Sequence, residues 1–322
     1  MSLTRTYSGD APVRLNKWLA QEGICSRREA EALIAQGQIA IDGAEVTEPG
    51  RKIAPGETLT VRSGGKAALD NKLTLVLHKP EGYVSGTPEA DQVPAIRLVT
   101  RETLSGRSPV IPGPRTQLAP LGRLDQDSRG LLLLSDDGVL ARAVIGPQSQ
   151  LEKEYRVRVT GRVTPAQLER LRHGLVLDEK PLKRATVEEV SPGLLKFVLT
   201  EGRNRQIRRM CQLVDLKVLD LIRIRIGPVS LGSLAEGRWR PLGGRERSLL
   251  IDAARGQASA HPPRRSSGSR PSKPPGETGA KSAGKGRSVP RDGNRGGPRP
   301  PSGPSGRARR NRPAGGGSRG DR

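Results

Sequence analysis

The run Gly122-Arg123-Leu124-Asp125-Gln126-Asp127-Ser128-Arg129 leads through Gly130 into four leucines, Leu131 to Leu134, and constrains the fold more than any other stretch. The polar residues are typical of a tight turn, and the leucines of a buried strand. Asp125 cannot pair into the core there, so we expect it to project from the end of a sheet. Its neighbours Arg123 and Arg129 are cationic. A carboxylate within a cationic surface repels phosphate, which favours an enzyme acting on a nucleic-acid base over a plain RNA binder.

Basic residues are abundant but unevenly distributed. The 322-residue chain has 56 Lys and Arg against 33 Asp and Glu, a net charge of +23. Residues 253–322 hold 17 basic and 3 acidic residues, a net charge of +14, which leaves +9 for residues 1–252. This Gly-, Pro-, Ser- and Arg-rich tail has too few apolar residues to form a core, so we expect it to be disordered. The rest of the chain is basic too, which favours a nucleic-acid partner independently of the tail.

Cysteine and histidine are too sparse to indicate a metal site or a disulfide framework. Cys25 and Cys211 are far apart, and His78, His173 and His261 do not cluster,. No apolar run approaches the length of a membrane span, and the N-terminus lacks the apolar segment of a signal peptide. We therefore expect a cytoplasmic protein with no metal, no cofactor and no membrane contact.

Residues 12–62 have the pattern of a small domain. Leu15, Trp18 and Leu19 follow helical spacing, and Ser26-Arg27-Arg28-Glu29 is a capping box that begins a second helix,. Asp42-Gly43 is typical of a hairpin turn between the short strands that follow. Residues 63–72, which include Gly64-Gly65, have the composition of a linker.

Residues 73–250 form a second, larger unit. Lys153–Val159 alternates strictly between polar and apolar residues, as a half-buried strand does,. Thr164-Pro165 begins a helix, and Ser191-Pro192-Gly193 joins two strands in a hairpin. Because strands and helices are mixed and several strands are joined by hairpins, we predict an α+β fold around a mixed, largely antiparallel sheet.

The stretch from Gly202 to Met210 is a second motif rich in arginine. Asn204 is the expected N-cap of a helix, whose buried stripe consists of Ile207, Met210, Cys211 and Val214,. An arginine cluster of this density usually faces solvent or phosphate.

Three motifs in this order resemble one enzyme family. Residues 122–133 resemble the GRLDxxSxGLLL signature of pseudouridine synthases, residues 153–159 their KEYxVxV motif, and residues 202–210 their GRxxQIRRM motif. The stretch VRLNKWLAQEGICSRREAEALIAQGQIAIDG resembles an S4 RNA-binding domain. Together these segments resemble the S4-containing ribosomal RNA pseudouridine synthases (the RsuA/RluB/RluF type), and most of all the RluF-like members that act on large-subunit RNA.

The resemblance implies roles for individual residues. Asp125 would be the catalytic residue, Tyr155 would pack against the target base, and Arg208 would pair with Asp125. Arg123 would occupy the space that the flipped base leaves. We expect further RNA contacts from these cations: Arg14, Lys17, Arg27, Arg28, Lys79, Arg203, Arg205 and Arg209. For Lys79 the alternative is a turn residue near the site, and for each of the first four an ordinary solvated position.

The sequence therefore predicts a monomeric enzyme that isomerises a specific uridine of ribosomal RNA to pseudouridine, in large-subunit (23S) RNA or its assembly intermediate. One alternative is a non-catalytic RNA-binding or ribosome-assembly factor. The other is a synthase that acts on small-subunit ribosomal RNA or on tRNA. Asp125, Tyr155 and Arg208 occurring together favour the enzyme, because a binder has no need of the acid.

Overall fold

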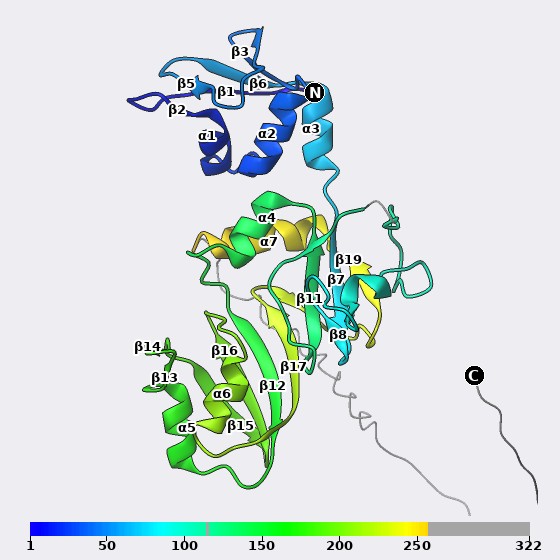
Figure 1. Ribbon diagram of the computed structural model, residues 1–322, viewed down its shortest axis with the longest axis vertical. Coiled ribbons are helices and arrows are strands. Elements are labelled where there is room, and N and C mark those ends of the chain that lie inside the picture. Colours follow the sequence, from blue (N-terminus) through cyan, green and yellow to red (C-terminus); the bar gives the residue numbers. More distant parts are fainter. Residues whose placement is uncertain (114–115, 257–322) are drawn as a thin grey trace, which may run out of the picture. The chain divides into compact units, whose positions relative to one another are not determined.

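The computed structural model describes residues 1–113 and 116–256 (Figure 1). The tail that we expect to be disordered, residues 253–322, lies outside the described residues except for its first four. Of these, Ala253 and Ala254 end helix α7 (Gly244–Ala254), because the buried Leu250 anchors that helix in the core. The predicted tail boundary was therefore too early.

The N-terminal region has its own small core. Helices α1 and α2 pack on a four-stranded antiparallel sheet in the order β1-β6-β3-β4, and the capping box predicted at Ser26 is present. Its elements are β1 (Leu3–Thr6), β2 (Val13–Arg14), α1 (Leu15–Gln21), α2 (Arg27–Ala35), β3 (Ile39–Ile41), β4 (Ala44–Glu45), β5 (Lys52–Ile53), β6 (Thr58–Val61) and α3 (Ser63–Asp70).

Helix α3 corrects the prediction of a linker at residues 63–72. Gly65 is buried, and a Cβ atom there would lie 3.1 Å from side-chain atoms of both Leu33 and Val61. The glycine thus permits close packing of the helix on the N-terminal core, and it does not act as a flexible joint.

The larger region is built on a nine-stranded sheet, and its α+β class agrees with the prediction. Strands follow the order β15-β16-β12-β17-β11-β7-β19, with β10 paired to β11 and β18 to β17. The elements are β7 (Thr74–Lys79), β8 (Tyr83–Val84), β9 (Val93–Pro94), a 3-10 helix (Ala95–Leu98), β10 (Ala119–Pro120), β11 (Arg129–Ser135), α4 (Gly138–Ile145), β12 (Lys153–Val159), α5 (Pro165–Arg172), β13 (Val176–Leu177), β14 (Lys180–Pro181), β15 (Thr186–Ser191), β16 (Leu194–Leu199), α6 (Gln206–Gln212), β17 (Val218–Ile226), β18 (Val229–Ser230), β19 (Trp239–Pro241) and α7.

Strands β11 and β17 join the two halves of this sheet over a short distance. They pair in parallel at Arg129 with Ile222 and at Gly130 with Arg223, whereas the sheet's other pairings in the described residues are antiparallel. Gly130 has a φ of +113°, and a Cβ atom there would lie 2.3 Å from the carbonyl oxygen of Arg223. Only glycine therefore fits where the strands meet. Arg129 strengthens the junction with two hydrogen bonds of 2.8 and 2.7 Å to Asp220 of β17.

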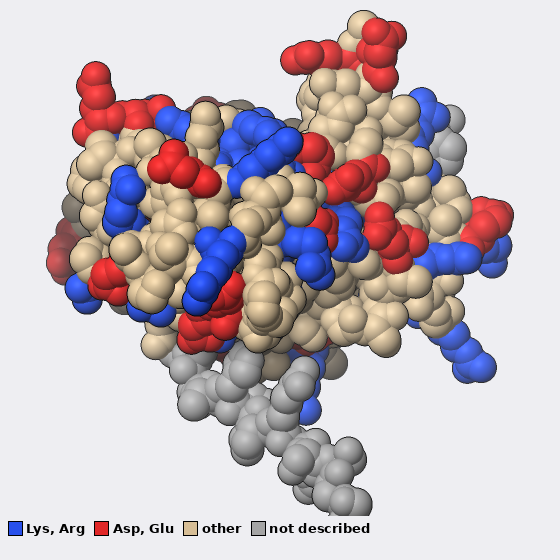
Figure 2. Space-filling model, turned by 90° about the horizontal axis from the view of Figure 1, so that it is seen from below, with Lys and Arg blue, Asp and Glu red and all other residues tan. Residues whose placement is uncertain are grey.

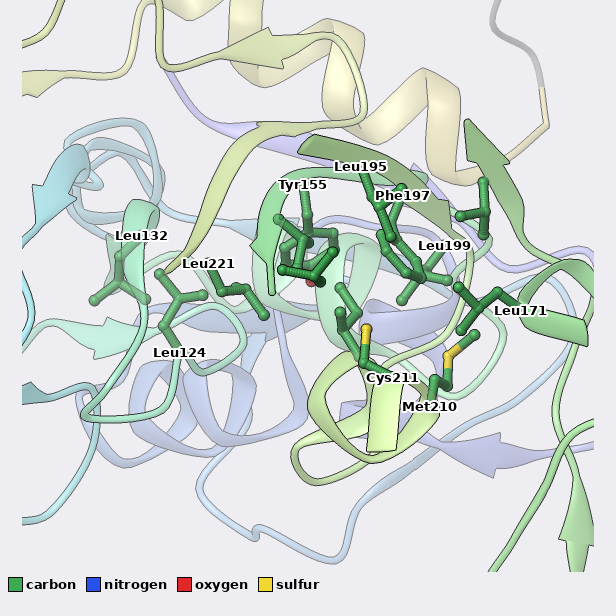
Figure 3. Close-up of a cluster of buried hydrophobic side chains, with 14 of the residues drawn as sticks. Leu124, Leu132, Tyr155, Leu171, Leu195, Phe197, Leu199, Met210, Cys211 and Leu221 are labelled. Carbon is green, nitrogen blue, oxygen red and sulfur yellow. The ribbon is translucent and has the colours of Figure 1, made fainter. Parts of the chain in front are cut away.

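The four leucines of β11 serve both faces of the sheet. Leu132 and Leu134 point into a core that includes α5 and α6, and Leu131 and Leu133 into a second core with α4 and α7. This division follows from the two-residue repeat of a strand. Figure 3 shows the first core, in which Leu124 and Leu221 lie on one side of Tyr155, and Phe197 and Leu199 on the other.

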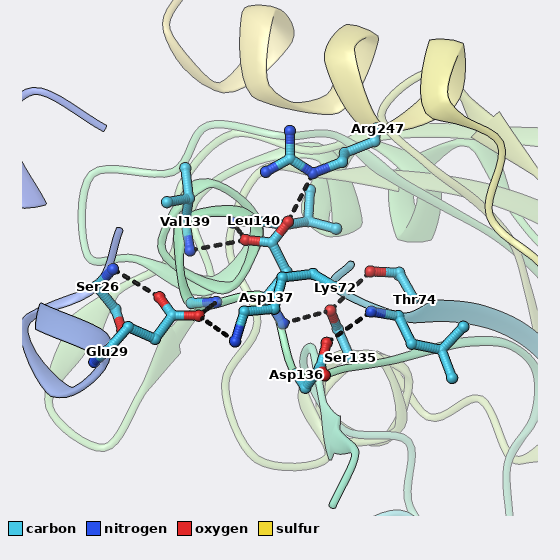
Figure 4. Close-up of polar contacts among 12 residues, drawn as sticks. Ser26, Glu29, Lys72, Thr74, Ser135, Asp136, Asp137, Val139, Leu140 and Arg247 are labelled. Carbon is cyan, nitrogen blue, oxygen red and sulfur yellow. Dashed lines mark hydrogen bonds and ion pairs between the residues drawn. The ribbon is translucent and has the colours of Figure 1, made fainter. Parts of the chain in front are cut away.

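Glu29 of α2 connects the N-terminal region to the larger one. Its carboxylate accepts a 2.7 Å hydrogen bond from the backbone of Ser26, pairs with Lys72 at 2.9 Å and accepts from the backbone of Gly138 at 3.4 Å (Figure 4). Burial raises the pKa of Glu29, but the hydrogen bonds from Ser26 and Lys72 outweigh it and hold this pKa below its ordinary value,.

Asp137 holds two helices of the larger region together. Its buried carboxylate caps α4 by accepting hydrogen bonds of 3.0 Å from the backbone of Val139 and Leu140,. The same carboxylate pairs with Arg247 of α7 at 2.6 Å (Figure 4). Both helices therefore cover the same face of the sheet.

Candidate active site

Asp125 lies in a short turn that ends immediately before β11. The backbone of Ser128 donates a 3.1 Å hydrogen bond to the carbonyl of Asp125, which closes the turn. Ser85 braces the preceding residue, because its hydroxyl donates to the carbonyl of Leu124 at 2.8 Å and accepts from its backbone N–H at 2.9 Å. Asp125 thus projects from the end of a buried strand, as the sequence predicts, and its side chain is 32% exposed.

Lys79 is fully buried, which rules out the predicted phosphate contact. Its ammonium group donates hydrogen bonds to the carbonyls of Pro80 at 2.7 Å and Tyr83 at 2.8 Å. Burial lowers the pKa of Lys79 to about 8,. The lysine holds the 80–83 turn, and Gly82 of that turn donates a 2.9 Å hydrogen bond to the carbonyl of Gln126. Of the two roles considered, Lys79 therefore has the turn role.

Asp125 faces a pocket of about 730 Å³. The acid comes from the turn before β11, and other lining residues come from β12, β17 and the start of α6. The side chains that bring charge or an aromatic ring to the lining are Arg123, Asp125, Lys153, Tyr155, Lys183, Glu201, Arg203, Arg205, Arg208 and Arg223. Cations outnumber acids in this set, so the pocket suits an anionic ligand.

Tyr155 is both a core residue and a wall of the pocket. It is 8% exposed, and in the sheet it pairs with Phe197 of β16 and Arg223 of β17. Because its neighbours on both sides are packed strands, its ring is held in one place. Such a ring gives a flat surface against which a base can stack.

Arg208 contacts Asp127, and the expected ion pair with Asp125 is absent from the described residues. Its Nε lies 3.3 Å from Asp127 Oδ2, and its terminal nitrogen donates to the backbone carbonyl of Asp127. Arg205 also binds Asp127, with hydrogen bonds of 3.1 and 2.7 Å, and it is the cation nearest Asp125, at 3.9 Å. The predicted pairing was wrong for this structure because Asp127, two residues further along the turn, takes both guanidinium groups.

These contacts keep Asp127 ionised. Partial burial raises its pKa, but the hydrogen bond from Arg205 and the charge of Arg208 hold it below the ordinary value,. The Arg205–Asp127 pair is exposed, with 44% and 46% of the two side chains accessible. Exposed pairs of this kind contribute about 0.2–1 kcal/mol to stability.

Arg205, and not Asn204, is the N-cap of α6. It has a φ of +48° and makes no side-chain cap hydrogen bond. A non-glycine residue in this left-handed region costs on the order of 1 kcal/mol. Since the exposed pair with Asp127 at most offsets that cost, stability alone does not explain an arginine here. The buried stripe of α6 that the sequence predicts is present.

Arg223 is a buried cation that sequence reasoning did not single out. It is 2% exposed, and it donates to the carbonyl of Leu131 at 2.8 Å and of Arg123 at 3.2 Å. Arg223 therefore ties β17 to the segment that carries Asp125. One of its terminal nitrogens is buried and has no hydrogen-bond partner among residues 1–113 and 116–256. Its alternation with Arg225 in β17 was visible in the sequence, but the packing that buries it was not.

The structure divides the other predicted RNA contacts into two groups. Arg203 lines the pocket but binds the carbonyls of Leu177, Lys180 and Pro181, so its main role is to hold the β13–β14 hairpin. Arg209 pairs with Asp178 at 2.7 and 2.9 Å outside the pocket. The cations Arg123, Arg14, Lys17, Arg27 and Arg28 are exposed.

Lys153 adds a further cation that the sequence analysis did not select. It begins β12, lines the pocket and donates a 3.1 Å hydrogen bond to the carbonyl of Leu151. Burial, and then the charges of Arg223 and Lys183, lower its pKa. Most charged side chains that line the pocket with Asp125 are therefore cations.

Acidic and basic side chains are interspersed on the face shown in Figure 2. The described residues contain no group of three or more His, Cys, Asp or Glu side chains arranged to hold a metal ion. Within the same residues, no helix is both long and apolar enough to cross a membrane.

Comparison with protein families matches the two regions separately. A family model described as RNA pseudouridylate synthase matches residues 73–213, and a model described as S4 domain matches residues 13–59.

Similar proteins match most of the length of the chain. An uncharacterized RNA pseudouridine synthase of Aquifex aeolicus is 35% identical over 232 residues, which cover 71% of this chain and 92% of the relative. The dual-specificity RNA pseudouridine synthase RluF of Escherichia coli K12 is 32% identical over 235 residues, 72% of this chain and 76% of the relative. A crystal structure of a pseudouridylate synthase superposes with a TM-score of 0.51 at 27% identity and covers 74% of this chain and 100% of that one.

Proposed function

The chain belongs to the S4-containing RNA pseudouridine synthases and is an isomerase, and we propose that its substrate is a specific uridine of ribosomal RNA, in the large-subunit (23S) molecule.

The position of Asp125 is the main observation that supports this pocket as the active site. This acid is braced at the end of β11 and faces a pocket whose other charged side chains are mostly cations. A volume of about 730 Å³ is within the range of pockets that hold a small ligand,. A protein that only bound RNA would gain nothing from a carboxylate there, because the carboxylate repels phosphate.

Asp125 would act at ribose C1′ of the target uridine. When the bond between C1′ and N1 breaks, the electron pair stays with the uracil ring, and C1′ becomes electron-poor. A carboxylate can then form a bond to C1′ or stabilise its positive charge. The ring turns and bonds to C1′ through C5, N1 gains a proton, and C5 loses one. The reaction is therefore neutral in protons and electrons and needs no redox step.

The other pocket residues would place the base for this reaction. Tyr155 is fixed between packed strands and would stack on the flipped uracil,. Arg123 is exposed on the same turn as Asp125 and would fill the space that the base leaves,. Arg208 would orient the turn through its contacts with Asp127.

Ribosomal RNA is the favoured substrate because of the S4 domain. Its cations Arg14, Lys17, Arg27 and Arg28 are exposed at the beginnings of two helices, where they can bind phosphate,. We infer that this domain holds a structured RNA while the pocket receives one nucleotide. A small-subunit ribosomal RNA or a tRNA is the alternative substrate.

Pseudouridine mapping tests both the proposed substrate and the proposed role of Asp125. Total RNA from cells with the protein, cells without it, and cells that carry Asp125→Asn would be compared. We expect one large-subunit site to lose its modification in the last two strains. A lost site in tRNA or small-subunit RNA would refute the proposed substrate, and full modification by the Asp125→Asn protein would refute the proposed role of Asp125.

A further inference from the structure

Arg205 and Asp127 form an ion pair at the edge of the pocket. Its geometry resembles that of an arginine bound to a phosphate group. Two terminal nitrogens of Arg205 hold the two carboxylate oxygens at 3.1 and 2.7 Å. The planar guanidinium fork binds two oxygens of a phosphate with the same geometry. Arg205 lines the pocket, whereas Asp127 does not, so the carboxylate holds the arginine from outside.

We propose that Arg205 exchanges partners when RNA binds. Its guanidinium leaves Asp127 and binds a backbone phosphate of the substrate. Asp127 thus competes with the RNA phosphate for Arg205, which forms a phosphodiester-binding site beside Asp125. The inference rests on the proposed function of the pocket and adds to it a specific phosphate contact.

The backbone of Arg205 supports a role beyond stability. Its left-handed conformation is one that glycine or asparagine adopts more easily, and it makes no cap hydrogen bond for α6,. The conformation instead directs the side chain toward the turn that contains Asp125 and Asp127. Strained residues of this kind are concentrated where ligands are held.

The exchange is feasible because the pair is accessible and Arg208 has further contacts that hold the turn. Nearly half of each side chain of the Arg205–Asp127 pair is exposed, so a phosphate can approach without unfolding the turn. Arg208 also lies 3.3 Å from the Asp127 carboxylate, but it is held in addition by hydrogen bonds to the backbone carbonyl of Asp127 and to the hydroxyl of Ser128. The turn therefore keeps its shape when Arg205 departs.

The same helix contains a matched control. Arg209 of α6 binds Asp178 with two hydrogen bonds of 2.7 and 2.9 Å, in the same fork geometry, but neither residue lines the pocket. Asp178→Asn thus removes an equivalent acid without opening the proposed phosphate site.

The experiment measures binding of the full chain to a fluorescent 20-nucleotide polyuridylate at several salt concentrations. Asp127→Asn should raise the affinity by about 5-fold at low salt, because the arginine is free and one repelling charge is gone. Arg205→Ala should lower the affinity and reduce the slope of log K against log salt by about 0.7, the loss of one phosphate contact to a single strand. Asp178→Asn should change the affinity by less than about 2-fold, as surface charges outside a site do.

The double variant decides the proposal. With Arg205→Ala in place, Asp127→Asn should raise the affinity by less than about 2-fold, because Arg205 can no longer be released and only the loss of a repelling charge and of the Arg208 contact remains,. An equal gain in both backgrounds, an equal effect of Asp178→Asn, or no effect of Arg205→Ala would overturn the exchange. Since polyuridylate binding is read without modification, these outcomes stay separate from a failure of the ribosomal RNA assignment.

Discussion

Replacing Lys79 with methionine should change how the stability of the protein depends on pH. Methionine has a similar length and no charge, so it can fill the same buried space. The variant loses the hydrogen bonds to the carbonyls of Pro80 and Tyr83, and leaving these two partly buried acceptors unpaired costs about 2–4 kcal/mol,. The substitution also removes an unfavourable free-energy term, the burial of a charged ammonium group, which stabilises the folded variant.

The pKa shift gives the size of that second effect. The pKa of Lys79 is about 8 in the folded protein against an ordinary value of 10.5. A difference of about 2.5 pKa units corresponds to about 3 kcal/mol. Below pH 8 the lysine is charged in both states, and the folded state bears the full cost. Between pH 8 and 10.5 the unfolded chain binds more protons, so the native protein gains stability as pH rises, and the variant lacks this gain.

Urea denaturation at a series of pH values from 7 to 10.5 measures the effect. The Lys79→Met protein should lie within about 1 kcal/mol of the native protein at pH 7 and about 3 kcal/mol below it at pH 10.5. Lys196→Met, which removes a partly exposed lysine paired with Glu188, controls for the loss of a lysine as such. If the free energy of unfolding had the same pH dependence in the native and Lys79→Met proteins, burying the Lys79 ammonium group would carry no free-energy cost.

Three further predictions concern the site and the charge of the chain. Arg208→Ala should lower the single-turnover rate by at least about 10-fold and RNA affinity by less than about 3-fold, because Arg208 contacts the turn that contains Asp127,. A steep loss of affinity with a normal rate would instead show that Arg208 contacts phosphate. Gly130→Ala should lower the free energy of unfolding by about 3 kcal/mol or more in urea denaturation, since its Cβ would meet the backbone of Arg223, and a native-like stability would refute the close approach,. Removing residues 257–322 should lower RNA affinity chiefly at low salt and leave the modified site unchanged; parallel salt slopes for the two proteins would show that these residues do not contact RNA.

Much of the fold was predictable because local patterns and tertiary packing agree. The alternation at Lys153–Val159 marks β12 at the same bounds, and the capping box at Ser26 and the pair Thr164-Pro165 mark the starts of α2 and α5. In each case the signal lies within a few residues, and the surrounding structure does not oppose it.

The errors arose where long-range packing decides the outcome. Gly64-Gly65 has the composition of a linker, yet Gly65 packs closely on the N-terminal core, where a Cβ atom would lie 2.9 Å from Cβ of Gln38 and 3.1 Å from side-chain atoms of Leu33 and Val61. For Lys79 the sequence left a phosphate contact and a turn role open, and only the packing that buries it favours its hydrogen bonds to the carbonyls of Pro80 and Tyr83. The predicted partner of Arg208 was displaced because Asp127 competes for the same arginines, and nothing in the spacing of the motif ranks the two acids.

The order of strands in the sheet has a consequence for how the protein is made. Strand β19 covers the outer edge of β7, and α7 packs beside α4, so the half-sheet that carries Asp125 is completed by residues 239–254. During synthesis, the strands of the other half emerge from the ribosome before these residues do. Until then, β7 presents an open edge, which is a template for pairing with other chains. A nascent chain that stalls before Trp239 should therefore depend on chaperones, although all the proposed pocket residues have already been made.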